Sequence, residues 1–335
     1  LFTLANEDNY AGFTLKEYGD IFRGIIAADV LDEVSNALLV LPENKARARA
    51  LFEEHLEFLH GEMERGGQNF YGQLTEMAEA LSQLELRFPL SRARRVLLDG
   101  EIYVRKDEFT TQGVIQKLAE RDIVTKRAPV LEWMRFVGYH NQHFQKQGVT
   151  LKDRRDLYIR NFIIKRLERK IKGILGKTGL CDPHIIDIAS VVKDGSQFVD
   201  THIVGEILLV IGGFFQESAN HVHGVLAVGP FACLPTRIVE SILTQESKVE
   251  GNERIRGVKN YRKLKEHHVL PYLSIEMDGN PLPQVVEARL EAFSLQVEKL
   301  HEKMERNGGG PGHSGGWWRR SLGSRRRLVT RPFDS

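Results

Sequence analysis

The sequence predicts an α/β protein, with a Rossmann-like, mostly parallel sheet and flanking helices that follow a helical N-terminal segment. Over the first 90 residues, apolar residues recur at helical spacing. From residue 94 onward, short apolar runs alternate with helical patterns, as in the βαβ units of parallel sheets. At 335 residues and 41% hydrophobic, the chain is able to bury a sizeable core.

Residues 1–90 are predicted to form the helical segment. Its first helix spans 14–40, where Thr14 is a suitable N-cap and Glu17 follows at the capping-box spacing. The residues expected to face inward recur every three or four positions, and they are Ile21, Ile25, Ala28, Leu31, Val34 and Leu38. Two further helices are predicted at 43–64 and 69–86.

The α/β domain is predicted to span residues 91–306. Its first strand begins at 96–98, with 101–104 as its continuation, and a helix at 109–121 leads to a second strand at 122–127. Strand, helix and strand at this spacing predict a right-handed βαβ crossover and parallel pairing.

The second half of this domain is predicted to repeat the passage from strand to helix. Its expected strands are 222–228 and 270–275. The expected helices are 151–175, 183–194, 200–217 and 236–244, and a charged connector occupies 246–268. A last helix is predicted from its apolar stripe, which comprises Val286, Leu290, Phe293, Val297, Leu300 and Met304.

Residues 307–335 are predicted to be a disordered, basic tail rich in glycine and arginine. The formal net charge of the chain is +2, and the tail holds six arginines, so the remainder is mildly acidic. That remainder offers no surplus of positive charge for nucleic acid. The arginines of the tail either bind polyanions or are simply solvated.

The cysteine count and the hydropathy pattern bear on the compartment. The chain has two cysteines, Cys181 and Cys233, fewer than a secreted disulfide scaffold usually carries, so a reducing, cytoplasmic location is expected. The longest apolar run, 207–215, is too short to span a bilayer, and 1–12 lacks the pattern of a signal peptide. We therefore expect no membrane association.

The first candidate site is the loop 229–235, which follows a strand and precedes a helix. Ligands of open α/β sheets bind beyond the carboxyl ends of the strands. Cys233 lies near the start of the following helix, where the macrodipole favours a thiolate that serves as a nucleophile or a metal ligand. The alternative is a small buried residue in a tight turn. Arg237 either holds an anion or is an exposed helix residue.

Two other strand ends carry polar residues. Glu101 and Arg105 follow the first strand, and they either contact substrate or pair with each other on the surface. Glu276 and Asp278 cluster after the last strand, and Asn280 precedes a proline turn. Paired carboxylates bind cations or perform acid–base work, but a segment rich in Asp, Gly and Asn is also typical of an ordinary turn.

Several chemistries have no signal in the sequence. The chain has no Walker A, G-x-G-x-x-G or G-x-S-x-G motif. Its histidines are not accompanied by a zinc-ligand spacing. We therefore expect no nucleotide-hydrolysing loop in this chain.

Three segments together resemble one family, the acyl-CoA dehydratase activase-related proteins, which are related to 2-hydroxyacyl-CoA dehydratases. The first is 97–109 (LLDGEIYVRKDEF) with 128–133 (APVLEW), the second is 229–243 (GPFACLPTRIVESIL), and the third is 273–293 (LSIEMDGNPLPQVVEARLEAF). The resemblance runs in order from about residue 13 to 304 and corresponds to the C-terminal region of these proteins.

The resemblance implies a part in iron–sulfur-dependent, ATP-driven electron transfer to an acyl-CoA-type substrate. By its position, Cys233 is the residue most similar to a ligand of a [4Fe–4S] cluster, whose other ligands come from outside this chain. ATP would enter only through a separate activase module, and the implied partners are that module or a dehydratase subunit. The substrate-binding candidates are Glu101, Arg105, Arg237, Glu276, Asp278 and Asn280.

The chain also departs from the family pattern. Ala232 stands where glycine is expected, and the ATP-binding module and the cysteine-rich region are absent from this sequence. We therefore expect the isolated chain to be inactive as an enzyme. The alternative function is a non-catalytic interaction module that docks an activase or dehydratase partner.

Overall fold

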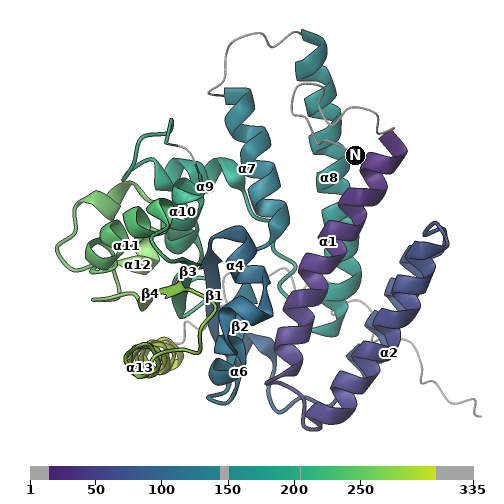
Figure 1. The fold of residues 1–335 in the computed structure, drawn as a ribbon, viewed down its shortest axis with the longest axis horizontal. Coiled ribbons are helices and arrows are strands. Elements are labelled where there is room, and N and C mark those ends of the chain that lie inside the picture. Colours follow the sequence, from purple (N-terminus) through teal and green to yellow (C-terminus); the bar gives the residue numbers. More distant parts are fainter. Residues whose placement is uncertain (1–14, 144–150, 204, 307–335) are drawn as a thin grey trace, which may run out of the picture.

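The computed structural model describes residues 15–143, 151–203 and 205–306, and its fold is of the predicted α/β class (Figure 1). A parallel sheet with helices packed on it lies beside a layer of long helices. The N-cap expected at Thr14 and the tail expected at 307–335 lie outside the described residues.

The sheet has four parallel strands in the order β2-β1-β3-β4. The strands are β1 (Arg94–Gly100), β2 (Ile123–Arg127), β3 (Gly224–Pro230) and β4 (Tyr272–Met277). The chain adds β2 on one side of β1 and then adds β3 and β4 on the other side. The order therefore reverses between β1 and β3, and a reversal of this kind is where open sheets bind ligands.

Helices cover both faces of the sheet because its strands are apolar on both sides. On one face, Val96 and Leu98 of β1 pack with α6 (Val114–Ala119) and with part of α13 (Gln284–Arg306). On the other face, Leu97 packs with α10 (Ile207–Glu217) and α11 (Leu234–Glu246). Five of the six residues in the predicted stripe of the last helix are buried, and Val286 is partly buried, which confirms its core role.

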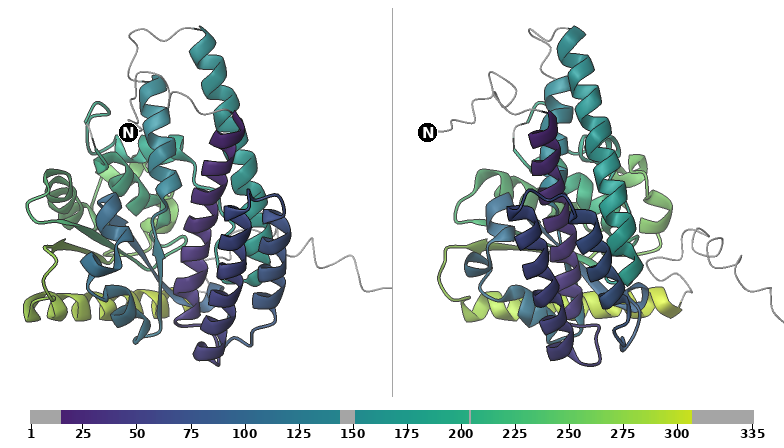
Figure 2. Two further views of the ribbon diagram at one scale, coloured as in Figure 1. Left: turned by 45° about the vertical axis from the view of Figure 1, so that its right-hand side comes forward. Right: turned by 90° about the vertical axis from the view of Figure 1, so that its right-hand side faces the viewer.

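The helical layer contains more than the N-terminal segment. Its helices are α1 (Leu15–Leu38), α2 (Lys45–Glu64), α3 (Phe70–Ser82) and α8 (Leu151–Leu175). In both views of Figure 2, α8 runs alongside α1, and Ile164, Ile171 and Leu175 share a core with the N-terminal helices. The helix predicted at 151–175 is thus confirmed, and it packs on residues more than 100 positions earlier.

The predicted inward face of the first helix is wrong in its N-terminal half. Ile21 is 41% exposed, whereas its neighbour Phe22 and also Ile26 are buried. Ile21 and Phe22 are adjacent and both apolar, so the helical periodicity alone is consistent with two different inward faces of this helix. Packing against α2 and α8 selects the face that carries Phe22.

The continuation of the first strand expected at 101–104 is also wrong, because α4 (Ile102–Lys106) occupies these residues. The strand ends at Gly100, whose φ is +108°. A Cβ atom there would lie 2.0 Å from the carbonyl oxygen of Val228, so only glycine fits this close approach to β3. Glu101 then caps the helix, since its side chain accepts a hydrogen bond from the Val104 amide at 2.8 Å.

The single helix expected at 109–121 is divided into α5 (Glu108–Thr111) and α6. Gln112 and Gly113 lie between the two, with φ of +48° and +71°, so the backbone leaves the right-handed helical region. A further helix, α7 (Val130–His143), was not predicted.

The remaining predicted helices begin or end a few residues away from their expected bounds. Residues 183–187, 200–203 and 205–206 are largely irregular, and the helices that follow them are α9 (Ile188–Gly195) and α10. The charged connector 246–268 contains a short helix, α12 (Tyr261–Leu264). It is packed through Ile255, Val258 and Leu264, which are buried with α10 and α11.

Candidate functional site

Three predicted segments meet at the carboxyl edge of the sheet. The ends of β1, β3 and β4 lead into the turn at Gly100, the loop before α11 and the turn before α13. Parallel pairing places these ends on the same side, and the order of the strands reverses between β1 and β3. We call this region the carboxyl edge.

Glu276 and Arg237 are brought together beside the cysteine loop. The Ala232 amide donates to Glu276 Oε1 at 3.0 Å, and Arg237 Nη2 donates to Glu276 Oε2 at 2.7 Å. Arg237 also contacts Glu240 at 2.8 Å. Both terminal nitrogens of Arg237 are thus bound by carboxylates. The Glu276 side chain holds the loop in place by accepting the hydrogen bond from the backbone amide of Ala232.

The two cysteines lie in different environments. Cys233 is half-buried and forms the N-cap position of α11, with no side-chain capping bond. Cys181 is buried in the core of the helical layer. Burial, reinforced by the nearby carboxylate of Glu33, raises the pKa of the Cys181 thiol well above its ordinary value. Cys233 is therefore the accessible cysteine.

Asp278 and Asn280 bond mainly to each other. The backbone and side-chain nitrogens of Asn280 both donate to the Asp278 carboxylate at 3.0 Å. These hydrogen bonds lower the pKa of Asp278. Gln112 Nε2 reaches the carbonyl oxygen of Gly279 at 3.2 Å and ties the turn to the segment after α5. The pair forms an Asx-type turn at the carboxyl edge.

Arg105 is not on the surface and does not pair with Glu101, so that expectation is wrong. Its side chain is 2% exposed, and Nη1 contacts Asp99 Oδ1 at 2.8 Å. The same nitrogen donates to the carbonyl oxygen of Gly100 at 2.8 Å. Asp99 lies on a buried strand, and a buried carboxylate is stable only with a counter-charge. Arg105 therefore stabilises the end of β1 and is not positioned to bind a substrate from solvent.

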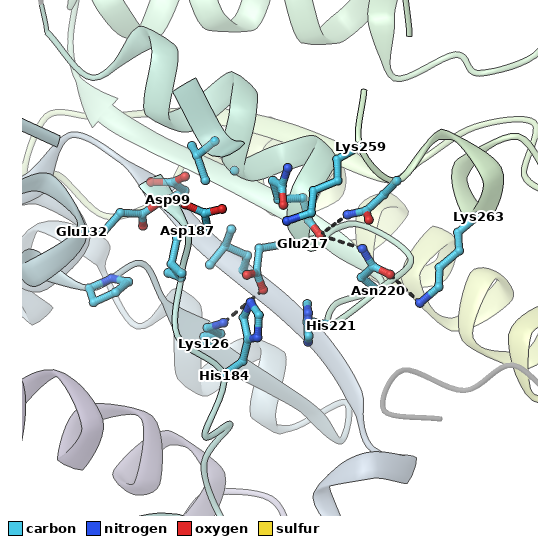
Figure 3. Close-up of a pocket in the computed structure, with 17 residues that line it drawn as sticks. Asp99, Lys126, Glu132, His184, Asp187, Glu217, Asn220, His221, Lys259 and Lys263 are labelled. Carbon is cyan, nitrogen blue, oxygen red and sulfur yellow. Dashed lines mark hydrogen bonds and ion pairs between the residues drawn. The ribbon is translucent and has the colours of Figure 1, made fainter. Parts of the chain in front are cut away.

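A cavity of about 280 Å³, which we call the polar cavity, lies against β1, β2, α7, α9 and α10 (Figure 3). Its titratable lining residues are Asp99, Lys126, Glu132, His184, Asp187, Glu217, His221, Lys259 and Lys263. The register places Lys126 opposite Leu97, on the same face of the sheet as Asp99. This density of charged groups in a cavity is typical of functional sites.

One wall of the polar cavity is a chain of ion pairs. Lys126 contacts Glu217 at 3.0 Å, and His221 Nδ1 contacts Asp182 at 3.1 Å. His184 stacks on His221 with ring centroids 4.8 Å apart. Burial alone would lower the pKa of Lys126 and raise that of Asp182. Opposite charges raise the pKa of Lys126, and the hydrogen bond from His221 together with opposite charges lowers the pKa of Asp182.

The other wall holds carboxyl groups with raised pKa values. Burial raises the pKa of Glu132 to about 8, and the neighbouring carboxylate of Asp99 adds to the shift. Burial also raises the pKa of Asp99, although Arg105 opposes this. Outside the polar cavity, beside Gly100 and Pro235, Glu206 accepts a hydrogen bond from the Ile102 amide at 3.2 Å, and burial raises its pKa to about 7. At neutral pH, Glu132 is thus largely protonated and is a hydrogen-bond donor.

Sequence reasoning missed most of the polar cavity. None of its lining residues was among the candidate site residues predicted from the sequence. The available signal was charge within strands, since Asp99 and Lys126 lie in or beside apolar runs predicted to be buried. The helix and loop members are spread from Glu132 to Lys263, and no spacing connects them.

Within the residues that the structure describes, no group of three or more His, Cys, Asp or Glu side chains is arranged to hold a metal ion. None of the helices in these residues is long and apolar enough to cross a membrane.

The fold and the carboxyl edge place the chain among the open-sheet α/β proteins. No protein-family model, curated protein or solved structure with which the chain was compared matches it.

Proposed function

We propose that this chain is an α/β module of an iron–sulfur-dependent, ATP-driven electron-transfer system that acts on an acyl-CoA-type substrate. The resemblance of three segments to the acyl-CoA dehydratase activase-related proteins suggests this role. The observation that carries it is the position of Cys233, which is half-buried at the start of α11 on the carboxyl edge. Cysteine thiolates are the usual ligands of iron–sulfur clusters.

The donor set of this chain does not complete a [4Fe–4S] site, which takes four thiolates. The sequence contains two cysteines, and Cys181 is buried in the helical layer. The chain is therefore proposed to supply one ligand, Cys233, with the others from a partner or from further sequence. Since no phosphate-binding loop was found in the sequence, ATP is proposed to act through a separate activase module.

Two of the six predicted substrate-binding residues already have partners within the chain. Glu101 is committed to capping α4 and Arg105 to pairing with Asp99. Arg237, Glu276, Asp278 and Asn280 remain at the carboxyl edge, near the cysteine loop or on the neighbouring turn. For these four residues a contact with the substrate stays a prediction.

The test is the iron content of the complete protein, purified without oxygen together with its activase partner. The proposal expects a brown protein whose iron is lost in Cys233→Ser and retained in Cys181→Ser. Cys181 is a matched control because it is the other cysteine of the chain. A colourless wild-type protein, or equal iron content in both variants, would overturn the proposal.

The alternative, a non-catalytic module that docks an activase or dehydratase partner, has one observation in its favour. Phe231 and Leu234, which flank Ala232 and Cys233 in the loop 229–235, are 73% and 69% exposed. Tyr103 and Phe109, which follow β1, are also exposed. Large apolar side chains on a surface mark interaction sites when they gather in one region. A colourless protein that binds its activase partner, and loses this binding in Phe231→Ser, would favour this function.

A further inference from the structure

Glu132 presents its carboxyl group to the polar cavity. It is 9% exposed, and it forms no hydrogen bond or ion pair with another residue in the described parts of the chain. Figure 3 shows its carboxyl group beside that of Asp99 at one end of the cavity. Its oxygens are open to the cavity, so a molecule bound there is able to provide the hydrogen-bond partner that the described residues do not.

Lys263 is the complementary feature toward the other end of the cavity in Figure 3. This half-buried ammonium donates to Asn220 Oδ1 at 2.6 Å and has no carboxylate within ion-pairing distance among the described residues. The orientation of Asn220 is fixed because its Nδ2 donates to the carbonyl oxygen of Gln216 at 2.9 Å. The nearby carboxylate of Glu266 acts on Lys263 without forming an ion pair, so Lys263 offers a positioned positive charge that is open to a ligand.

Lys259 adds a second ammonium on the same side. Its Nζ contacts Ser190 Oγ at 3.3 Å, and that hydroxyl donates to Asp187 at 2.7 Å. The carboxylate of Asp187 offsets the charge of Lys259. Of the other charged residues in the cavity, Asp99 pairs with Arg105 and Glu217 pairs with Lys126. The uncompensated charge of the cavity is therefore positive and lies toward Lys263.

The size of the cavity limits the ligand. A volume of about 280 Å³ lies at the lower end of the range for ligand pockets, roughly 300–1,000 Å³. A volume at this end of the range suits a short acid with a few carbon atoms better than a nucleotide or a coenzyme.

We infer that the polar cavity binds a small carboxylic acid whose carboxylate is held by Lys263, with support from Lys259, and whose carbonyl oxygen accepts a hydrogen bond from Glu132. The carboxylate satisfies the unpaired ammonium, and the carbonyl oxygen satisfies the unpaired carboxyl group. This site is separate from the proposed role of Cys233, and neither depends on the other.

The experiment is calorimetric titration of the whole chain at pH 7 with 4-oxopentanoate and with pentanoate. Both probes carry a carboxylate on a short chain, and only the first has the ketone. We expect 4-oxopentanoate to bind about tenfold or more tightly, which is the size of effect that one hydrogen bond to a charged or strongly polar group provides. Inorganic phosphate serves as a third probe and tests for an anion site without selectivity for carbon compounds.

Two variants locate the binding. Lys263→Met should weaken 4-oxopentanoate by about tenfold or more, whereas Lys265→Met, at an exposed neighbouring position, should not. Glu132→Gln keeps a donor and should retain the preference for the ketone, whereas Glu132→Leu should abolish it. If Lys263→Met melts more than about 4 °C below the wild type, Lys263→Gln replaces it.

Four results would overturn the inference. One is that neither 4-oxopentanoate nor phosphate binds at concentrations up to about 50 mM, because a site with a still higher dissociation constant would not be specific. Another is equal binding of 4-oxopentanoate and pentanoate, and the third is unchanged binding in the Lys263 variant. Tight binding of phosphate alone would also reject the carboxylic acid and leave only an anion site.

Discussion

Arg105 shows how a single buried charge changes the interpretation of a sequence. In the sequence it lies in a polar stretch after a strand, which favours an exposed or substrate-binding role. In the structure its guanidinium is covered and paired with Asp99 at 2.8 Å. Removing one partner of such a pair leaves an uncompensated buried charge, at a typical cost of about 3–5 kcal/mol. The first role of Arg105 is therefore to stabilise the fold, and not to contact a ligand.

The two cysteines lead to the first prediction. Iodoacetamide at neutral pH should alkylate Cys233 faster than Cys181, by roughly tenfold or more, because labelling of a buried residue requires local opening. The raised pKa of Cys181 acts in the same direction, since only the thiolate reacts. The measurement is the alkylation rate of each cysteine by mass spectrometry, with Cys233→Ser as the control. Faster labelling of Cys181 would show that the accessible cysteine has been misassigned.

Glu132 gives a second prediction, on stability against pH. Its folded-state pKa is about 8, above the ordinary 4.5, so the folded state binds more protons than the unfolded state between these values. The free energy of unfolding should therefore fall as the pH rises from about 5 to 8. The groups that act on Glu132 are Asp99, Arg105, Glu217 and Lys126.

In Glu132→Gln this proton uptake is removed, so the fall should be shallower by up to about 1.4 kcal/mol per pH unit. Urea unfolding at pH 5, 6, 7 and 8 measures the slope. Glu120→Gln, at an exposed position after α6, is the control and should keep the slope of the wild type. Parallel curves for the wild type and Glu132→Gln would contradict the prediction.

At the scale of the elements, the junctions after β1 and β3 decide the shape of the carboxyl edge. Gly100 adopts a left-handed φ and lies against the backbone of Val228, so the chain turns there and does not extend the strand. Ala232, two residues beyond the end of β3, has a φ of +57°. Glycine was expected at this position, and the left-handed conformation gives a physical reason for a glycine there.

The third prediction concerns this junction. Ala232→Gly should stabilise the protein by up to about 1 kcal/mol, because glycine adopts a positive φ without a Cβ penalty. The hydrogen bond from the backbone of residue 232 to Glu276 is retained. Ala232→Val should be destabilising, since a β-branched residue is disfavoured there. Urea unfolding of the three proteins checks the order, and a valine variant as stable as the wild type would argue against a left-handed residue 232.

At the scale of the whole molecule, α8 belongs to the predicted α/β domain by its position in the sequence, but it packs in the helical layer. It follows β2 in the chain but packs on the N-terminal helices through Ile164 and Ile171. The boundary predicted at residue 90 therefore separates sequence segments, while the helical layer also takes in a later helix. At the other end of the described chain, α13 covers the face of the sheet that carries Val96 and Leu98, through Phe293 and Val297.

The fourth prediction concerns the end of the chain. Deletion of residues 307–335 should change the melting temperature by less than about 4 °C, because the segment has no apolar periodicity with which to pack. A chain that ends at residue 297 should melt at a clearly lower temperature, since it lacks the buried Leu300 and Met304. Differential scanning fluorimetry compares the three proteins. A large loss of stability on removal of 307–335 alone would show that this segment packs against the rest.

The elements that the sequence predicted well are those with strong local patterns. The helix at 151–175 and the stripe of the last helix agree with the structure, and so do the strand near 123–127 and the strand–loop–helix passage around Cys233. Local patterns failed where two apolar faces compete, as at Ile21 and Phe22. They also failed where one residue redirects the backbone, as at Gly100 and Gln112.

The sequence by itself determined the α/β class and the position of Cys233 between a strand and a helix, because both follow from periodicity and from the order of the elements. Only the tertiary structure decided that Glu276 meets Arg237 and that Arg105 is covered. Only the structure also showed that residues from Asp99 to Lys263 line one cavity. Burial and charge pairing depend on which segments meet in space, and parallel strands with long crossovers bring together residues that no local spacing connects.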